Sequence, residues 1–435
     1  MLDIKFIREN SELIAEAARK KCIKIDLERL LAVDEKRRAL IQEVDEMRRV
    51  HKEASDRIGA MPQEKRGEFI AELKSAKDRL SHKEFELKSI EAEFDELMFS
   101  VPNIPDPSVP NGKSDEENQE IRDWKPYEDE SALPTLSSIS GEDYLTIMKR
   151  HEMVDLERGA KVAGFRGYFL KNDGAILSMA MWRFALDHLI KKGFVPFLAP
   201  SIVHEENLIG TGWIGCGVSN QAKDDVYKTQ DELYLAGTAE VPMMGFHARE
   251  ILTEQELPKK YAAFSLCFRR EAGSYGKDTR GIYRVHEFFK VEQIVLCKAE
   301  HQESVRWHEE LTKNSEEIMR ALEIPYRVVL NCGGDLGLGQ VKKYDIEGWL
   351  PSENRYRETH SASYFHDFQT RRLNIKYRSL DGELRFVHSL NNTAIATPRI
   401  LEQFLENHQR PDGSISIPKA LQQYFGKEKI KKERS

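Results

Sequence analysis

The densest group of side chains that could do chemistry lies between residues 268 and 292. The run Phe268-Arg269-Arg270-Glu271 ends one strand-like segment, and a second such segment begins near residue 286. Because side chains alternate along a strand, the second segment carries four of them on one face: His286, Phe288, Lys290 and Glu292. The sequence therefore predicts two neighbouring strands that bring arginine, aromatic and carboxylate groups together.

The loop between these segments combines glycines with basic residues: Gly273, Gly276 and Gly281 with Lys277, Arg280 and Arg284. Glycines permit a tight chain reversal, and a fixed array of guanidinium groups suits the oxygens of a polyphosphate. Phe288 on the same face could stack on a purine ring. Arginines on surface hairpins are also common, so these residues alone leave an ordinary solvated hairpin as an alternative.

Two further clusters carry suitable groups. Thr238-Ala-Glu240 follows the strand-like Leu233-Tyr-Leu235 and could meet an ammonium group. The run from Leu390 to Arg399 reads as a strand that enters an amphipathic helix, with the arginine at the junction.

Other patterns are weaker. The glycine-rich segment 333–339 lacks the Lys-Ser/Thr pair of a phosphate-binding P-loop, so we expect only a turn. His360 and His366 have no HExxH partner, so no zinc site is expected. The five cysteines form no CxxC pair, and this indicates free thiols in a reducing cytosol: Cys22, Cys216, Cys267, Cys297 and Cys332.

The elements that position these groups belong to a chain of 435 residues, which exceeds the usual size of a single small domain, so we expect two domains. With 40% apolar and 32% charged residues, the chain is typical of a core-forming protein. Its start, MLDIKFIREN, has charges where a signal peptide needs an apolar run, and no stretch is apolar enough to span a membrane. We therefore expect a cytoplasmic protein. The net charge of −7 argues against a globally basic nucleic-acid binder but leaves room for a local basic patch.

Residues from about 27 to 98 show two heptad series separated by a Gly/Pro break at Gly59-Ala60-Met61-Pro62. The first series is Val33, Leu40, Met47 and Ala54, interleaved with Val44, His51 and Ile58. The second is Leu73, Leu80, Leu87 and Phe94, interleaved with Ala76, Lys83, Ile90 and Leu97. This pattern predicts an antiparallel helical hairpin, a coiled-coil arm on the order of 40 Å long. Periodicity alone also fits a spacer or a dimerisation element.

A proline-rich run, Val101-Pro-Asn-Ile-Pro-Asp-Pro-Ser-Val-Pro110, follows the hairpin and cannot be helix or central strand. We therefore predict an N-terminal domain over 1–105, a linker over 106–125 and a second domain over 126–435. In the second domain, alternating apolar runs such as Ala262-Phe264-Leu266-Phe268 are interspersed with helical ones. This indicates an α+β fold, a mainly antiparallel sheet flanked by helices.

Taken in order, these motifs resemble those of class II aminoacyl-tRNA synthetases, and within that class the seryl-tRNA synthetases. Arg269-Arg-Glu271, the glycine loop and Phe288 resemble motif 2. Gly193-Phe-Val-Pro-Phe-Leu-Ala-Pro200 and the helix before it resemble motif 1, and Arg399 with its helix resembles motif 3. The features that point to the seryl family are Thr238-Ala-Glu240, Lys290-Val-Glu292, Tyr344-Asp-Ile-Glu-Gly-Trp-Leu-Pro351 and Asp367-Phe-Gln-Thr-Arg-Arg372, together with the hairpin and the proline linker.

The resemblance implies an ATP-dependent serine–tRNA ligase that forms seryl-adenylate and transfers serine to the 3′ end of serine tRNA. It implies a serine site of five residues: Thr238, Glu240, Arg269, Glu292 and Thr393. It implies that ATP is bound by nine: Arg269, Arg270, Glu271, Phe288, Glu358, Thr359, His360, Ser361 and Arg399. In these roles Arg269 and Arg399 are catalytic, and Phe288 and Arg399 sandwich the adenine. The segment Glu358-Thr-His-Ser-Ala-Ser-Tyr364 departs from the commoner Glu-x-Ser-Ser-Cys-Ser-Asn of the family.

The resemblance also implies Mg²⁺ bound by Glu358 and Ser361, a homodimer formed through motif 1, and a hairpin that grips serine tRNA. Whether selenocysteine tRNA is serylated as well stays open. Two other classes are alternatives: an amino acid:carrier-protein ligase, and a catalytically inactive synthetase-like protein. The full arm counts against the first, and the second is disfavoured by five retained residues: Arg269, Glu271, Glu292, Glu358 and Arg399.

Overall fold

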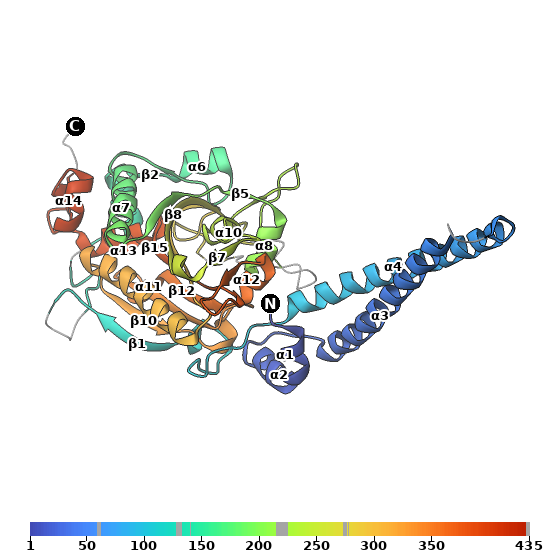
Figure 1. Cartoon of the computed structure of the whole chain (residues 1–435). Helices are drawn as coiled ribbons and strands as arrows, with labels where there is room; N and C mark the ends of the chain where they lie inside the picture. The colour runs from blue at the N-terminus through green and yellow to red at the C-terminus, as the bar shows by residue number, and fades with distance from the viewer. Residues whose placement is uncertain are drawn as a thin grey trace.

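The computed structural model describes residues 1–58, 62–127, 133–139, 141–214, 225–272, 276 and 278–431. Within these residues a long helical hairpin projects from a larger body of sheet and helices (Figure 1). Some residues that the sequence singled out lie outside the described ones: Gly59, Ala60, Met61, Cys216, Gly273 and Lys277.

The arm consists of α3 (Leu27–Arg57) and α4 (Gln63–Ser100), which confirms the predicted hairpin (Figure 1). The Asp26 carboxylate starts α3 by accepting a hydrogen bond from the Arg29 N–H at 2.9 Å. Near the base of the arm, heptad residues are buried in a common cluster: Val33, Leu40, Ile90 and Phe94. Two short helices that the heptads did not reveal precede the arm and pack at its base: α1 (Ile4–Glu9) and α2 (Ser11–Lys20).

The segment predicted as the linker has two parts. Between residues 101 and 118 its only regular element is the 3₁₀ turn η2 (Asp115–Glu117), but Gln119–Trp124 forms strand β1. This strand pairs antiparallel with β10 (Tyr326–Leu330) at the edge of the main sheet. Its composition looked linker-like because an edge strand keeps much of its surface in water. Arg122 nevertheless binds the Glu316 carboxylate at 2.9 Å, which fastens β1 to the body.

The body is built on an eight-stranded sheet in the order β1-β10-β11-β12-β15-β9-β8-β4. All neighbouring strands are antiparallel except β4 and β8, so the predicted mainly antiparallel sheet is confirmed. The remaining strands of this sheet are β4 (Val195–Leu198), β8 (Lys259–Phe268), β9 (Glu287–Cys297), β11 (Lys342–Leu350), β12 (Arg355–His366) and β15 (His388–Thr397).

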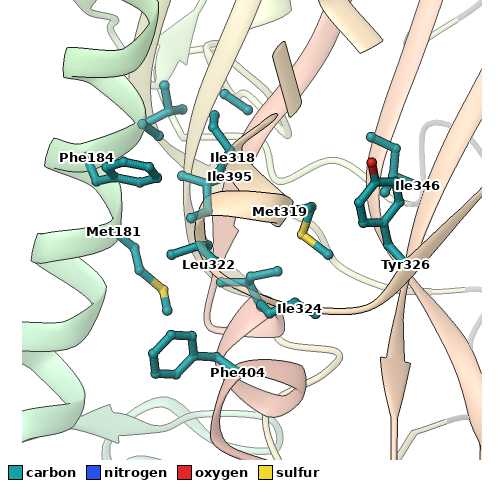
Figure 2. Packing of buried hydrophobic residues seen from close by; sticks show 14 of the residues in the cluster. Met181, Phe184, Ile318, Met319, Leu322, Ile324, Tyr326, Ile346, Ile395 and Phe404 are labelled. Carbon is teal, nitrogen blue, oxygen red and sulfur yellow. The ribbon is translucent and has the colours of Figure 1, made fainter. Parts of the chain in front are cut away.

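Three helices cover one face of the sheet: α7 (Asn172–Lys191), α11 (His301–Ala321) and α13 (Arg399–His408). Figure 2 shows how Met181 and Phe184 of α7 and Ile318 and Met319 of α11 meet Ile395 of the sheet in one apolar cluster. This cluster forms the main core, and its burial fixes which face of each strand points toward the helices.

Smaller elements complete the body. The other helices are α5 (Tyr144–Arg150), α6 (Leu156–Ala163), α8 (Glu205–Thr211), α10 (Glu240–Gly245), α12 (Phe368–Leu373) and α14 (Lys419–Phe425). The other strands are β2 (Val154–Asp155), β3 (Phe169–Leu170), β5 (Ile202–Val203), β6 (Tyr234–Leu235), β7 (Ile251–Thr253), β13 (Lys376–Arg378), β14 (Leu384–Phe386), β16 (Ile415–Ser416) and β17 (Lys429–Ile430). Two more 3₁₀ turns are η3 (Glu254–Glu256) and η4 (Gly333–Asp335). None of the described helices is long and apolar enough to cross a membrane.

Candidate active site

A cavity of about 420 Å³ opens on the face of the sheet that is not covered by α7, α11 and α13. Most of the residues that the sequence predicted for a site line it: Thr238, Glu240, Arg269, Glu271, Phe288, Glu292, Glu358, Thr359, Ser361, Thr393 and Arg399. They come from segments more than 150 residues apart in the chain, and the central strands bring them together.

Strand β9 shows how the alternation works. Phe288, Lys290 and Glu292 point into the cavity. Between and after them, Val291 joins the core under the helices, and the Gln293 amide donates to Leu311 O of α11 at 3.2 Å. The period-2 reading of this strand is therefore confirmed from Phe288 to Glu292, but it was wrong for His286, which precedes β9 and does not line this cavity.

At one end of the cavity, Lys290 and Glu292 form a buried ion pair. The Lys290 ammonium also donates to Thr238 Oγ1 at 2.8 Å, and Thr238 Oγ1 lies 3.5 Å from Glu292 Oε2. Thr393 is the direct register partner of Glu292 on β15 and lines the same end. We call the cavity surface formed by Thr238, Glu240, Lys290, Glu292 and Thr393 the acidic end.

Glu240 begins α10 and is almost fully buried at the acidic end. Its carboxylate accepts hydrogen bonds from Gln369 Nε2 at 2.5 Å and from Trp213 Nε1 at 3.4 Å. Burial raises the pKa of Glu240 to about 7, and the nearby Glu292 carboxylate adds to this rise. A bound cation would favour the ionised form, so this group suits an ammonium ligand.

Arg269 lies at the centre of the cavity wall. Its guanidinium carbon is 5.2 Å from the centre of the Phe288 ring and 5.3 Å from that of Trp213. Its Nε is buried and has no hydrogen-bond partner among the residues that the structure describes. A buried donor that is left unsatisfied costs free energy, so Arg269 is poised to bind an anion in the cavity.

At the opposite end, Arg399 starts α13 and stacks on Tyr283, with the guanidinium carbon 4.3 Å from the ring centre. Its Nη1 lies 3.5 Å from Glu358 Oε1. The Glu271 carboxylate accepts from Arg284 Nη1 at 2.6 Å. We call this region, formed by Glu271, Tyr283, Arg284, Glu358 and Arg399, the arginine end. In this structure Arg269 is the arginine beside Phe288, and Arg399 is beside Tyr283.

Two predicted residues do not line the cavity. Arg270 is exposed, because its side chain alternates with that of Arg269. A bulge in β12 between Glu358 and His360 lets both Glu358 and Thr359 line the cavity. His360 alternates with Thr359 and Ser361 and therefore points toward the covered face. His360 Nε2 lies 3.0 Å from Ala394 O, and burial lowers the pKa of His360 to about 4, so the ring is neutral.

The sequence also missed several lining residues. Lys290 had a detectable signal, because it shares the period-2 face of Phe288 and Glu292. Others lie on segments that are distant in sequence and had no local pattern to identify them: Trp213, Gln340, Ser363 and Asn391.

Known proteins resemble this chain over its whole length. Residues 1–105 match the model of the seryl-tRNA synthetase N-terminal domain, and residues 224–408 match that of the tRNA synthetase class II core domain (G, H, P, S and T). The chain is 45% identical to a serine–tRNA ligase of Deinococcus radiodurans over 427 residues, which is 98% of each protein. It is 42% identical to the serine–tRNA ligase of Pyrococcus abyssi, covering 100% of this chain and 99% of that one.

Solved structures of seryl-tRNA synthetases also resemble the whole chain. The seryl-tRNA synthetase from Pyrococcus horikoshii, complexed with ATP, superposes with a TM-score of 0.85 at 39% identity, covering 100% of both chains. The cytoplasmic serine–tRNA ligase of Naegleria fowleri, in complex with AMP, gives 0.83 at 32% identity and covers 100% of this chain and 99% of that one. The likeness includes the arm as well as the catalytic half, which favours the tRNA ligases over the carrier-protein ligases. The chain therefore belongs to the seryl-tRNA synthetase family.

Proposed function

We propose that this protein activates L-serine with ATP and transfers the serine to the 3′ end of serine tRNA. The observation that carries the proposal is one cavity in which a buried carboxylate–hydroxyl end adjoins two arginines. The family membership of the whole chain supports it, and so do the relatives named serine–tRNA ligases.

The acidic end suits serine. Thr238 and Glu240 would receive the amino group, and Glu292 with Thr393 would bind the side-chain hydroxyl. Arg269, with its unsatisfied Nε, would hold the carboxylate between this end and the α-phosphate of ATP. Serine is zwitterionic, so an end that offers anions for its ammonium and a guanidinium for its carboxylate matches both charges.

The arginine end suits ATP. Phe288 would stack on the adenine, Glu271 would contact it, and Arg399 would reach the phosphates. In the first step, a serine carboxylate oxygen forms a bond to the α-phosphorus, and the bond from that phosphorus to the bridging oxygen of pyrophosphate breaks. No protein nucleophile is needed, so the residues act by positioning and by stabilising charge.

Glu358 and Ser361 fit a Mg²⁺ ion on this end. Among the described residues, no three His, Cys, Asp or Glu side chains are grouped as a metal site. Mg²⁺ in phosphate-transfer sites usually takes one or two carboxylates and completes its shell with substrate phosphates and water, and one carboxylate plus one hydroxyl match that requirement. A Mg²⁺ ion bound there would neutralise negative charge on the phosphate oxygens.

In the second step, a hydroxyl of the terminal tRNA adenosine attacks the carbonyl carbon of seryl-adenylate, and AMP leaves. We propose that the arm, α3 and α4, binds the tRNA while residues 126–435 carry the chemistry. Several basic residues of the arm are paired with acids, for example Arg48 with Glu84 at 2.8 Å, so recognition would rest on shape and on exposed apolar groups such as Phe85 as well as on charge.

We also propose a homodimer and a cytoplasmic location. The motif 1 region exposes large apolar side chains on α7 and on the edge strand β4, including Met179 at 60% and Leu198 at 84% exposure. An uncovered apolar edge of this kind favours a partner subunit. The four described cysteines are free, as is usual in a reducing compartment.

The decisive experiment is serine-dependent exchange of labelled pyrophosphate into ATP, without tRNA, followed by charging of total tRNA. We expect exchange with serine and Mg²⁺, and charging of serine tRNA. Exchange that is fastest with another amino acid, or that is absent in a folded sample, would overturn the proposal.

A further inference from the structure

One wall of the cavity is made by a loop that the chemistry above does not use. Residues 337–340, between η4 and β11, line the cavity. We call them the wall loop. The Gln340 side chain accepts from Gly337 N at 2.6 Å and donates to Ser363 Oγ at 2.8 Å, so the loop is closed on itself and fastened to β12.

The wall loop lies next to the acidic end. Ser363 is the register partner of Asn391 on β15, and Asn391 is two residues from Thr393 on the same face. Along β12, Ser363 is two residues from Ser361 and five residues from Glu358 of the arginine end. On its other side the wall loop packs against α12: Gly339 lies against the Phe368 ring, and the next residue, Gln369, donates to the Glu240 carboxylate at 2.5 Å. A shift of the wall loop would therefore reach the acidic end by two routes.

Residues of the N-terminal segment donate hydrogen bonds to the wall loop and hold it in place. Lys21, directly after α2, is buried, and its ammonium group donates to Gly337 O at 3.0 Å, Leu338 O at 2.9 Å and Gln340 O at 2.5 Å. These three bonds use all three ammonium hydrogens.

Asn103, just beyond α4, completes the set. Its side-chain amide donates to Gly339 O at 3.0 Å and to Phe365 O at 2.8 Å, and its backbone N–H donates to Leu338 O at 2.9 Å. Each of the four wall-loop carbonyls thus accepts a hydrogen bond from residues 1–105. The contact is close: a Cβ on Gly333, just before the wall loop, would lie 2.2 Å from Lys20 O.

A buried ammonium group is costly, and burial lowers the pKa of Lys21 well below its usual range. The four carbonyls are costly too if they are left without donors. Lys21 therefore favours one geometry of the loop. Without it, Gln340 O has no donor among the described residues, and Gly337 O and Leu338 O keep only the backbone N–H groups of Gln340 and Asn103.

We infer that Lys21 and Asn103 are positioning residues for serine binding. Through these two side chains, the base of the arm holds the wall loop beside the acidic end of the cavity. This rests on the proposed function for the identity of the substrate. The two side chains touch no substrate; they act by keeping the wall loop in its binding-competent state.

The test uses full-length protein with Lys21→Met, which keeps the length of the side chain and removes the donors, and Asn103→Ala. In pyrophosphate exchange we expect KM for serine to rise roughly three- to tenfold in both variants, as the competent loop becomes a minority state. We expect KM for ATP to stay within about twofold, because the arginine end is held by other contacts. Lys24→Met, an exposed neighbour, serves as the matched control and should change neither.

Hydrogen exchange of the amides of residues 336–341 supplies a readout that does not depend on activity, and it should be faster in both variants. If Lys21→Met does not fold, by melting followed with circular dichroism, Asn103→Ala decides. An unchanged KM for serine, or an equal rise for both substrates, in a folded variant would overturn the inference. Wild-type protein that shows no serine-dependent exchange would instead overturn the proposed function, and the hydrogen-exchange result would still report on the wall loop.

Discussion

Replacement of Glu292 by Gln tests how serine is distinguished from alanine. The two substrates differ by one oxygen, so an apolar pocket could not favour serine, whereas a site built to bind the hydroxyl can reject the deoxy analogue by roughly 10⁴-fold. The Glu292 side chain is only 3% exposed and is paired with Lys290, so alanine would leave a buried carboxylate without its ligand.

A hydrogen bond to a charged group contributes about 1.5–3 kcal/mol and one between neutral groups about 0.5–1.5 kcal/mol. Glu292→Gln keeps the shape and removes the charge, a loss of about 1.4 kcal/mol, so the serine/alanine ratio of kcat/KM should fall about tenfold. Glu292→Ala removes the acceptor altogether, a loss of about 2.7 kcal/mol, and should lower the ratio about a hundredfold.

The assay is kcat/KM for serine and for alanine in pyrophosphate exchange, with Glu287→Gln as control because Glu287 is exposed on the same strand and does not line the cavity. Both variants remove the negative charge that pairs with Lys290, but the Gln amide oxygen can still accept a hydrogen bond from the Lys290 ammonium, so the Gln variant is the cleaner of the two. An unchanged serine/alanine ratio in both variants would refute the idea that this carboxylate reads the hydroxyl.

Three other predictions concern the arm, Glu240 and the dimer interface. Replacing residues 30–97 by a short linker should leave pyrophosphate exchange largely intact and abolish tRNA charging; charging at near full rate would show that the arm is only a spacer. Because ammonium binding needs ionised Glu240, whose pKa of about 7 lies far above that of an exposed carboxyl, kcat/KM for serine should rise as the pH passes upward through about 7. Glu240→Gln should be weaker and flat over that range, and a wild-type profile that falls with pH would contradict the assignment. Light scattering at micromolar concentration should give a dimer mass, and Leu198→Asp, on the exposed edge of β4, should shift it toward the monomer; a wild-type monomer would refute the interface.

Much of the fold could be predicted from the sequence because several elements follow short-range periodic patterns of side chains. The heptads of residues 27–98 identify α3 and α4, and the alternation around Phe288 identifies the face of β9 that carries the site. These patterns are local, since each depends on side chains within a few residues of one another.

The rest depends on contacts between distant segments. The edge strand β1 looked like linker because its partner, β10, lies about 200 residues away in the sequence. His360 lies between Thr359 and Ser361, so strand alternation places it on the other face, whereas the bulge between Glu358 and His360 lets Glu358 share the face of Ser361, and a bulge leaves little trace in composition. Nothing near Lys21 in the sequence shows that its ammonium group will lie among the carbonyls of Gly337, Leu338 and Gln340.

The hydrogen bonds at the base of the arm have a consequence for protein engineering. The Phe99 carbonyl of α4 accepts a hydrogen bond from Arg372 at 2.9 Å, and the Met1 amino group donates to Phe368 O, so both ends of the N-terminal segment are attached to the catalytic body. Arms grafted from relatives with other tRNA preferences should therefore be joined within α3 and α4, so that residues 1–26 and 99–105 are kept from the host. A graft joined in the proline-rich segment would carry a foreign Lys21 and Asn103 position into the host's serine pocket, and tRNA choice and amino-acid affinity would then change together.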